Sequence, residues 1–385
     1  MRKTTHIIIY FILLLSLSAN ILCILPYKEI IKEKFDRKFN KEAHTYWEEN
    51  TPDSIFINSV KDKAMKMDGK AYTVEEYVGL FEDIKNMFRD RESYKVKNDF
   101  NISYCYAGLS YYALERKDPI VLNYLQKLSK SITKNNVDEL NYDITQIVQI
   151  PIGIMFINLY KATGIIKYKN VAISIFNKLK EFREDGNIIP YFKNSNYRFV
   201  DGVGMYVPFL MEYFELTQDS LAREIALDNM NDFRKNCTDK ETGIPHHGYD
   251  PKTKMKLGSA NWGRGIGWFL LAAAYCNKEY KDSLLQHNIG KMPYQQFPLQ
   301  IGSNFDSSTA IMFEIYKQSQ DSLRVPQLLD IKTRTTHVGI IDHCSGDTHN
   351  YNDYSHTFGA GEMCNGFLLI LISKFDNVNN YYTNK

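Results

Sequence analysis

The sequence feature that most constrains the fold is a weak internal repeat with a period of about fifty residues. Each copy joins two amphipathic helical patterns, with apolar residues at i, i+3, i+4 and i+7, through a short polar turn. An Asp or Ser in the turn is well placed to accept a hydrogen bond from a backbone N–H at the start of the next helix. The five copies begin at Tyr112, Leu159, Tyr213, Tyr280 and Tyr316.

The repeats predict an all-α fold. Five hairpins, an apolar helix over residues 361–374 and an early helix over residues 74–88 make roughly twelve helices. That number closes a ring, so we expect an (α/α)6 barrel, a toroid of six hairpins with a funnel at one end. The alternative is an open solenoid, which would need a polar-faced terminal cap that the sequence does not show.

The N-terminus predicts an export signal. Arg2 and Lys3 precede an almost unbroken apolar run from Ile7 to Leu25, nearly long enough to span a bilayer. A cleaved peptide and an uncleaved anchor both fit this pattern; a buried soluble helix and lipidation at Cys23 are weaker alternatives. We therefore expect the protein to be exported, whether periplasmic, secreted or membrane-anchored and facing outward.

These patterns divide the chain into three predicted segments. Residues 1–27 are predicted as a signal peptide or membrane anchor, residues 28–71 as a charged linker or stalk with little periodicity, and residues 72–378 as the (α/α)6 domain.

Composition excludes some functions. The chain has 385 residues, of which 44% are hydrophobic, so it can bury a large core. Its 47 basic and 45 acidic side chains are mixed along the chain and give a net charge of +2, so no nucleic-acid partner is expected. The cysteines after Cys23 are widely spaced, with no C-x-x-C pair, so we predict neither a structural zinc site nor a disulfide.

Asp201 is the first candidate for chemistry. It stands between Val200 and Gly202, directly before a strongly apolar helical pattern. One interpretation is a helix N-cap. The other is a general acid that keeps its proton in an aromatic, water-poor pocket. The sequence leaves both interpretations open.

A second candidate site surrounds Arg264. Trp262 and Trp268 flank this arginine within seven residues that also contain three glycines. Glycine lets a ligand approach the backbone closely, indole faces stack on sugar rings, and a guanidinium grips a carboxylate through two hydrogen bonds. The set suits an acidic sugar; the alternative is an arginine in a core ion pair between packing tryptophans.

Histidines concentrate near the C-terminus. Their intervals are irregular, which favours a polar loop at the rim of the funnel over a metal site. The histidines concerned are His337, His343, His349 and His356.

The motifs Asp201-Gly202, His247-Gly-Tyr-Asp250 and Trp262-Gly-Arg-Gly-Ile-Gly-Trp268 resemble, in order and spacing, those of the unsaturated glycuronyl hydrolases. The resemblance is to the unsaturated rhamnogalacturonyl hydrolases of glycoside hydrolase family 105 and to the neighbouring family 88. It covers about residues 72–375 and extends to the Asp306-Ser-Ser segment.

The resemblance implies an exported hydrolase that removes a 4,5-unsaturated uronic acid from the non-reducing end of oligosaccharides generated by lyases. The residue matching the family's general acid and base is Asp201. His247 and Arg264 would bind the sugar hydroxyls and the uronate, and Trp262 and Trp268 would shape the subsite. The partner is an acidic oligosaccharide, and no metal or organic cofactor is implied.

The sequence departs from the family at one position that matters. Alignment on Gly153 and Leu159 puts Gln149 where a second Asp is usual, with Asp143 six residues earlier. Either Gln149 keeps the hydrogen-bonding part of that role in substrate binding, or Asp143 substitutes for it, or activity has been lost. A catalytically silent carbohydrate-binding protein on the same scaffold is therefore the alternative function. A third hypothesis is another α/α-toroid enzyme that acts on saturated glycans.

Overall fold

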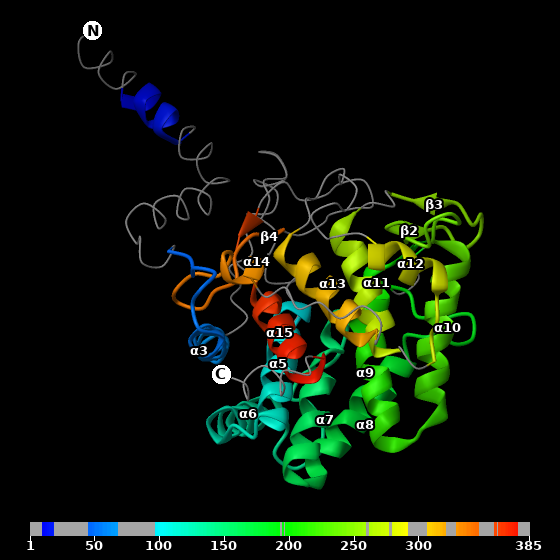
Figure 1. Ribbon diagram of the computed structural model, residues 1–385, viewed down its shortest axis with the longest axis horizontal. Helices are drawn as coiled ribbons and strands as arrows, with labels where there is room; N and C mark the ends of the chain where they lie inside the picture. Colours follow the sequence, from blue (N-terminus) through cyan, green and yellow to red (C-terminus); the bar gives the residue numbers. More distant parts are fainter. Residues whose placement is uncertain are drawn as a thin grey trace.

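The helical hairpins predicted from the repeats are present in the computed structural model (Figure 1). It describes residues 10–18, 45–67, 97–192, 195, 197–258, 262–276, 279–291, 306–320, 329–345, 358–359 and 361–375. The helix pairs are α5 (Phe100–Glu115) with α6 (Pro119–Ile132), α7 (Ile152–Thr163) with α8 (Ile166–Lys180), α9 (Asp201–Thr217) with α10 (Ser220–Asn236), and α11 (Gly263–Tyr275) with α12 (Ser283–Lys291).

The first helices of the pairs form a closed inner ring. α5 packs against α7, α7 against α9, α9 against α11, and α11 against α13 (Ser307–Ser319). α13 packs against α15 (Glu362–Ile370), which returns to α5. The closure confirms the (α/α)6 barrel and excludes the open solenoid. α15 continues as η6 (Leu371–Phe375), so the predicted last helix is confirmed, whereas the helix predicted over 74–88 lies outside the described residues.

The turns before α6, α10 and α12 are capped as the sequence predicts, whereas no side chain caps the start of α8. The Asp118 carboxylate accepts hydrogen bonds from the backbone N–H groups of Ile120 and Val121, at 2.9 and 3.1 Å, at the start of α6. Asp219 and Asp282 accept in the same way at the starts of α10 and α12. These bonds satisfy N–H groups that have no partner within the helix.

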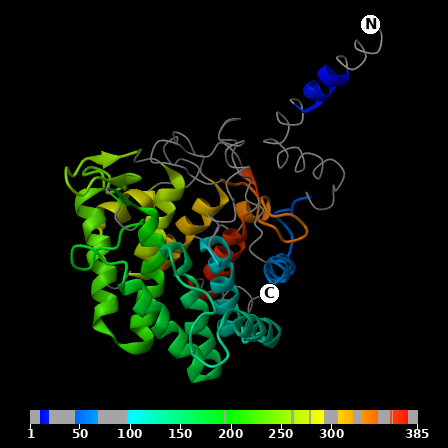
Figure 2. The same cartoon turned by 180° about the vertical axis from the view of Figure 1, so that it is seen from behind.

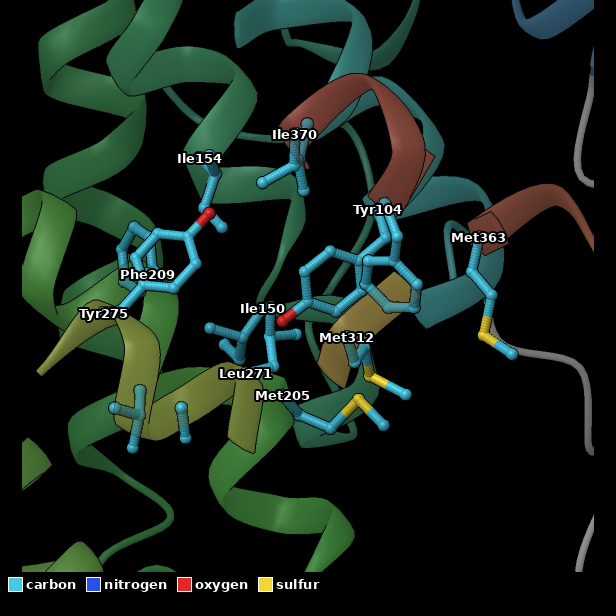
Figure 3. Packing of buried hydrophobic residues seen from close by; sticks show 14 of the residues in the cluster. Tyr104, Ile150, Ile154, Met205, Phe209, Leu271, Tyr275, Met312, Met363 and Ile370 are labelled. Atoms are coloured by element: carbon cyan, nitrogen blue, oxygen red, sulfur yellow. The ribbon is translucent and has the colours of Figure 1, made fainter. Parts of the chain in front are cut away.

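Two glycines let the ring close. At Gly108 of α5 and Gly366 of α15 the two backbones touch, and a β-carbon on either would collide with main-chain atoms of the other helix. Away from this contact the inner helices interlock through large apolar side chains. Figure 3 shows side chains from several inner helices pointing toward one another, among them Tyr104, Ile154, Met205, Phe209, Leu271, Tyr275, Met312 and Ile370.

Short strands and helices lie between the long helices. β1 (Arg198–Phe199), β2 (Gly248–Tyr249) and β3 (Lys256–Leu257) form one antiparallel sheet, and β4 (Cys344–Ser345) pairs with β5 (Phe358–Gly359) in another. Because the inner helices run parallel to one another, their N-termini share one end of the ring. There β1 leads into α9, and β4 packs beside the start of α13. The remaining elements are α3 (Asp53–Ala64), η4 (Ile147–Gln149) and α14 (Leu329–Lys332).

Part of the segment predicted as a linker over 28–71 belongs to the packed domain. α3 lies against α5 and α15 and buries Phe56, Val60 and Ala64 completely. Their spacing of four residues puts them on one face of the helix. The many charged residues in this segment concealed the apolar spacing in the sequence. Because α3 is packed, the folded domain begins before residue 72.

Residues 10–18 of the predicted signal or anchor form a helix that stands apart from the barrel in both views (Figures 1 and 2). Its apolar side chains are exposed. No helix in the described part of the chain is both long and apolar enough to cross a membrane.

A disulfide joins Cys344 of β4 to Cys364 in the first turn of α15. The prediction of no disulfide is therefore wrong. Wide spacing in sequence was a poor guide, because the ring brings β4 beside α15. The thiols of Cys105, Cys237 and Cys276 are free and buried.

A buried ion cluster holds the opposite end of the barrel. Glu212, in the last turns of α9, is fully buried, and its carboxylate contacts the ammonium groups of Lys161 of α7, at 2.6 Å, and Lys374 of η6. The Lys374 ammonium also lies over the rings of Tyr111 and Tyr275, at 5.2 and 4.9 Å. Burial acts to raise the pKa of the Glu212 carboxyl, but the charges of Lys374 and Lys161 outweigh it and lower that pKa to about 2.

We predict that Glu212→Gln lowers the free energy of unfolding by about 3 kcal/mol at pH 7, because a pKa shift is a difference in stability. The native carboxylate has the lower pKa, so its contribution is complete above the ordinary glutamate pKa of 4.5 and is lost as the pH falls toward about 2. Denaturant titrations from pH 7 to pH 3 should therefore show wild type and variant converging at low pH.

The matched control is Glu181→Gln, which removes an exposed carboxylate paired with Lys178 at 3.2 Å. Such a surface pair contributes about 0–1 kcal/mol, so this variant should stay close to wild type at every pH. An equal loss in both variants would contradict the role given to the buried cluster.

Candidate active site

Asp201 and His247 are brought together by the small sheet at the N-terminal end of α9. Phe199 pairs with Gly248, and the N–H of Val200 donates to the carbonyl of His247 at 2.8 Å. The imidazole Nε2 of His247 then lies 3.3 Å from Oδ2 of Asp201. Asp201 is the first residue of α9; its N-cap is Val200, and no side chain caps the helix there. The N-cap interpretation of Asp201 is therefore wrong.

The carboxyl faces an aromatic wall. The His247 ring lies 4.0 Å from the Trp262 ring and 5.3 Å from the Phe199 ring, measured between centroids. Trp262 and His247 are buried, and the Asp201 side chain is only 15% exposed. Gly265 lies under the indole of Trp262, where a β-carbon would collide with the ring. This glycine therefore lets Trp262 reach the histidine.

Arg264 contacts the same indole as His247. Its guanidinium carbon is 6.0 Å from the indole centroid, a distance typical of cation–π contact. Nη1 donates a 2.8 Å hydrogen bond to the carbonyl of Ser345. Asp201, His247, Trp262 and Arg264 thus form one chain of contacts, which is the grouping predicted from the sequence.

Trp268 has a different position. It is fully buried and packs against Phe100, Tyr104 and Phe367 in the barrel core. It also lies on Gly204 of α9, where a β-carbon would collide with the indole. Its described contacts are those of a core residue that supports the site, and its contact with substrate stays a prediction.

Tyr104 secures the turn of α9 that follows Asp201. Pro208 lacks an N–H, so the helix cannot supply the usual donor to the carbonyl of Gly204, four residues earlier. The hydroxyl of Tyr104 donates to that carbonyl instead. Burial raises the pKa of Tyr104 well above its ordinary value, so the hydroxyl remains a donor. Tyr104 and Trp268 together fix the start of α9.

The described contacts of Gln149 are with the backbone of nearby loops, and Asp143 is on the surface. The side-chain oxygen of the buried Gln149 accepts from the backbone N–H of Thr145 at 2.9 Å and of Gln146 at 3.2 Å, and its Nε2 donates to the carbonyl of Lys97 at 2.9 Å. The amide thus holds the loop before η4, which packs beside α9. Asp143 is exposed. Substrate binding by either residue stays a prediction.

Of the C-terminal histidines, His337 contacts Trp47 and His343 stacks on Tyr46. His349 and His356 lie outside the described residues. Among the residues that the structure describes, no cluster of three or more His, Cys, Asp or Glu side chains could hold a metal ion.

An aromatic surface that was not predicted from the sequence begins beside the site. The rings of Tyr191, Phe192 and Tyr197 each lie 6.3 to 6.4 Å from that of Phe199, which in turn lies beside His247. Phe192 is 54% exposed and Tyr197 37%. The signal was four aromatic residues within nine positions before Asp201.

The fold is shared with solved glycoside hydrolases. A family 105 enzyme from C. acetobutylicum ATCC 824 is 18% identical, with a TM-score of 0.55 over 75% of this chain and 97% of that one. A possible family 105 member from Klebsiella pneumoniae is 12% identical, with a TM-score of 0.65 over 85% and 92%. A family 88 hydrolase from Bacteroides vulgatus is 14% identical, with a TM-score of 0.51 over 75% and 97%.

The sequence itself matches Glycosyl Hydrolase Family 88 over residues 80–298, more than half of the chain. This range contains Asp201, His247, Trp262 and Arg264, whose side chains the fold assembles at one end of the inner ring. The chain therefore belongs to Glycosyl Hydrolase Family 88 and is a glycoside hydrolase.

Proposed function

We propose that this hydrolase removes a 4,5-unsaturated uronic acid from the non-reducing end of lyase-generated oligosaccharides, with Asp201 as general acid and base. The observation that carries the proposal is the connected group of a carboxyl, an imidazole, an indole and a guanidinium. A guanidinium fork matches a uronate, and an indole offers an apolar face to a sugar ring.

The reaction proceeds as hydration of an enol ether. The carboxyl of Asp201 gives its proton to C4, and positive charge develops at C5 and the ring oxygen. Water attacks C5 and returns a proton to Asp201. The C5 hemiketal opens to a ketone, and the hemiacetal left at C1 releases the rest of the oligosaccharide as an alcohol. One water is consumed for each glycosidic bond broken.

A single carboxyl suffices for this sequence because the proton given to C4 is replaced by one from the attacking water. The separation of two carboxylates that governs ordinary glycosidases therefore need not apply. This fits a site in which Gln149 uses its amide to hold a loop. The imidazole of His247, in contact with Asp201, can hold a sugar hydroxyl or the water beside the carboxyl.

The aromatic surface of Phe192, Tyr197 and Phe199 suits the sugars that follow the unsaturated residue. Sugar rings stack on exposed aromatic faces, and this surface begins beside His247. Arg198, between two of these aromatics, is buried and paired with Glu184 at 3.1 Å. The surface therefore favours neutral sugars at these positions.

We further propose that the protein is exported. The cationic and apolar N-terminus, the exposed apolar helix over 10–18 and the disulfide between Cys344 and Cys364 support this, because disulfides persist in oxidising compartments.

Asp201→Asn should reduce turnover by about 10³-fold, because the amide cannot donate and take back the proton. The assay follows the ultraviolet absorbance of the conjugated double bond, which disappears as each substrate molecule is hydrated, across a panel of lyase products. Asp250→Asn is the control, since this turn residue caps backbone N–H groups of Lys252 and Thr253 and should remain active. Absence of turnover by wild type across the panel would refute the proposed reaction.

Arg264→Ala should weaken binding of uronate-ended oligosaccharides by about 10- to 100-fold, since a hydrogen bond to a charged group contributes about 1.5–3 kcal/mol. Calorimetry in the Asp201→Asn background measures binding without turnover, and the methyl ester of the same sugar should lose the dependence on Arg264. Arg223→Ala, at an exposed arginine 3.8 Å from Glu279, is the matched control. Tight binding by wild type without turnover would establish the silent binding protein instead.

Export is tested on cells that express the full chain with a C-terminal tag. The tag should be reached by protease from outside the cytoplasmic membrane, and N-terminal sequencing shows whether residues 1–27 are cut. Leu13→Arg combined with Leu14→Arg charges the exposed apolar helix and should keep the protein inside. An uncut wild-type chain found wholly inside would contradict the proposal.

A further inference from the structure

Asp306 makes more contacts than a helix cap needs. It is fully buried at the start of α13, where Oδ1 accepts from the N–H of Thr309 and the hydroxyl of Ser308, both at 2.7 Å. That oxygen alone caps the helix. The second oxygen, Oδ2, accepts from the N–H of Ser345 at 2.8 Å and from the hydroxyl of the same residue. One of the two carboxylate oxygens therefore binds strand β4 instead of the helix.

Both backbone groups of Ser345 are held by inner-ring side chains. Its N–H donates to Asp306 of α13, and its carbonyl accepts from Nη1 of Arg264 of α11 at 2.8 Å. Asp306, Ser345 and Arg264 are each buried, so their hydrogen bonds are shielded from water. A carboxylate and a guanidinium on different helices are thus connected through one residue of the backbone.

The residues that precede Ser345 are also held in place. Ser307 donates its N–H to the carbonyl of His343 at 3.0 Å and its hydroxyl to the carbonyl of Asp342 at 2.6 Å. The disulfide binds Cys344 to α15. Residues 342–345 are therefore fixed to the starts of α13 and α15, and the Ser345 carbonyl has little freedom to move.

We propose that Asp306 is a positioning residue of the active site: it holds Ser345 so that the Ser345 carbonyl fixes the guanidinium of Arg264. Arginine has a long side chain with many rotamers, and holding it before substrate arrives removes an entropic cost from binding. Trp262 limits the guanidinium on one side, and Ser345 supplies the directional contact. This inference rests on the proposed role of Arg264 in gripping the uronate.

A purely structural role for Asp306 gives a different expectation. If the residue only caps α13, its loss lowers stability and leaves substrate affinity alone. If it acts through Arg264, its loss raises KM more than it lowers kcat, and the effect disappears once Arg264 has been altered.

The test is a double-mutant cycle with Asp306→Asn and Arg264→Lys. Asp306→Asn keeps the shape of the side chain, but its amide has a single acceptor oxygen and cannot accept from both the start of α13 and Ser345. We expect kcat/KM to fall by about 10- to 100-fold in the wild-type background, mainly through KM, and by less than about 3-fold in the Arg264→Lys background. Additive effects in the two backgrounds would overturn the inference.

Asp219→Asn is the matched control, because it alters a capping carboxylate whose bond within the described residues is to the N–H of Leu221 at the start of α10. It should lower stability with unchanged KM. If Asp306→Asn does not fold, Ser345→Ala takes its place in the cycle: it removes one of the two bonds to Oδ2 and keeps both backbone groups. Its smaller rise in KM should also vanish beside Arg264→Lys, and a rise that persists there would count against the inference.

A readout without substrate separates this inference from the proposed function. In selectively labelled protein, the guanidinium ¹⁵N–¹H signals of Arg264 report rotation of the side chain. In wild type and in Asp219→Asn the signals should report a guanidinium whose rotation is restricted. In Asp306→Asn they should report one that rotates freely. If Asp306→Asn releases the guanidinium of Arg264 but the wild-type protein shows no turnover, the proposed reaction is rejected and the positioning role is retained. A guanidinium equally held in Asp306→Asn would reject the positioning role whatever the reaction.

Discussion

Closure of the inner ring is the constraint on which the rest of the structure depends. The inner helices bury nearly their whole circumference; in α7, for example, every residue from Ile152 to Leu159 is buried. Such helices need a neighbour on both sides, and the last must return to the first. The backbone contact between Gly108 and Gly366 makes that return possible. Because an outer helix returns the chain after each inner helix, the inner helices run parallel, and the closed ring gathers their N-termini, with Asp201, Arg264 and Asp306, at one end.

The sequence predicted those parts of the protein that depend on local patterns. The turn carboxylates Asp118 and Asp219 cap helices because each stands directly before a helix, within reach of N–H groups that lack an intrahelical partner. The grouping of His247, Trp262 and Arg264 around Asp201 was also predictable, since their segments break the helical pattern with glycines and lie where chains enter inner helices. Gly265 shows why the glycine is needed: it makes room for the Trp262 ring.

Other features could not be predicted because they depend on contacts between residues far apart in the chain. Gln149 bonds to the carbonyl of Lys97, 52 residues away, and Asp306 bonds to Ser345, 39 residues away. Nothing local to either residue announces its partner. The link between Cys344 and Cys364 has the same origin. The core contacts of Trp268 were not predictable for a different reason, since its motif resembles that of a sugar-binding tryptophan.

Three buried or half-buried carboxylates show how the barrel divides stability from chemistry. Glu212 is held by two lysines, and Asp306 accepts four hydrogen bonds from backbone and hydroxyl groups. The two lysines lower the pKa of the Glu212 carboxyl, and the four hydrogen bonds of Asp306 fix it between α13 and β4. Among the described residues, no lysine or arginine forms an ion pair with Asp201; its contact is with the imidazole of His247. The carboxyl that we propose as the general acid and base is therefore the one that has no lysine or arginine ion pair in the described part of the chain.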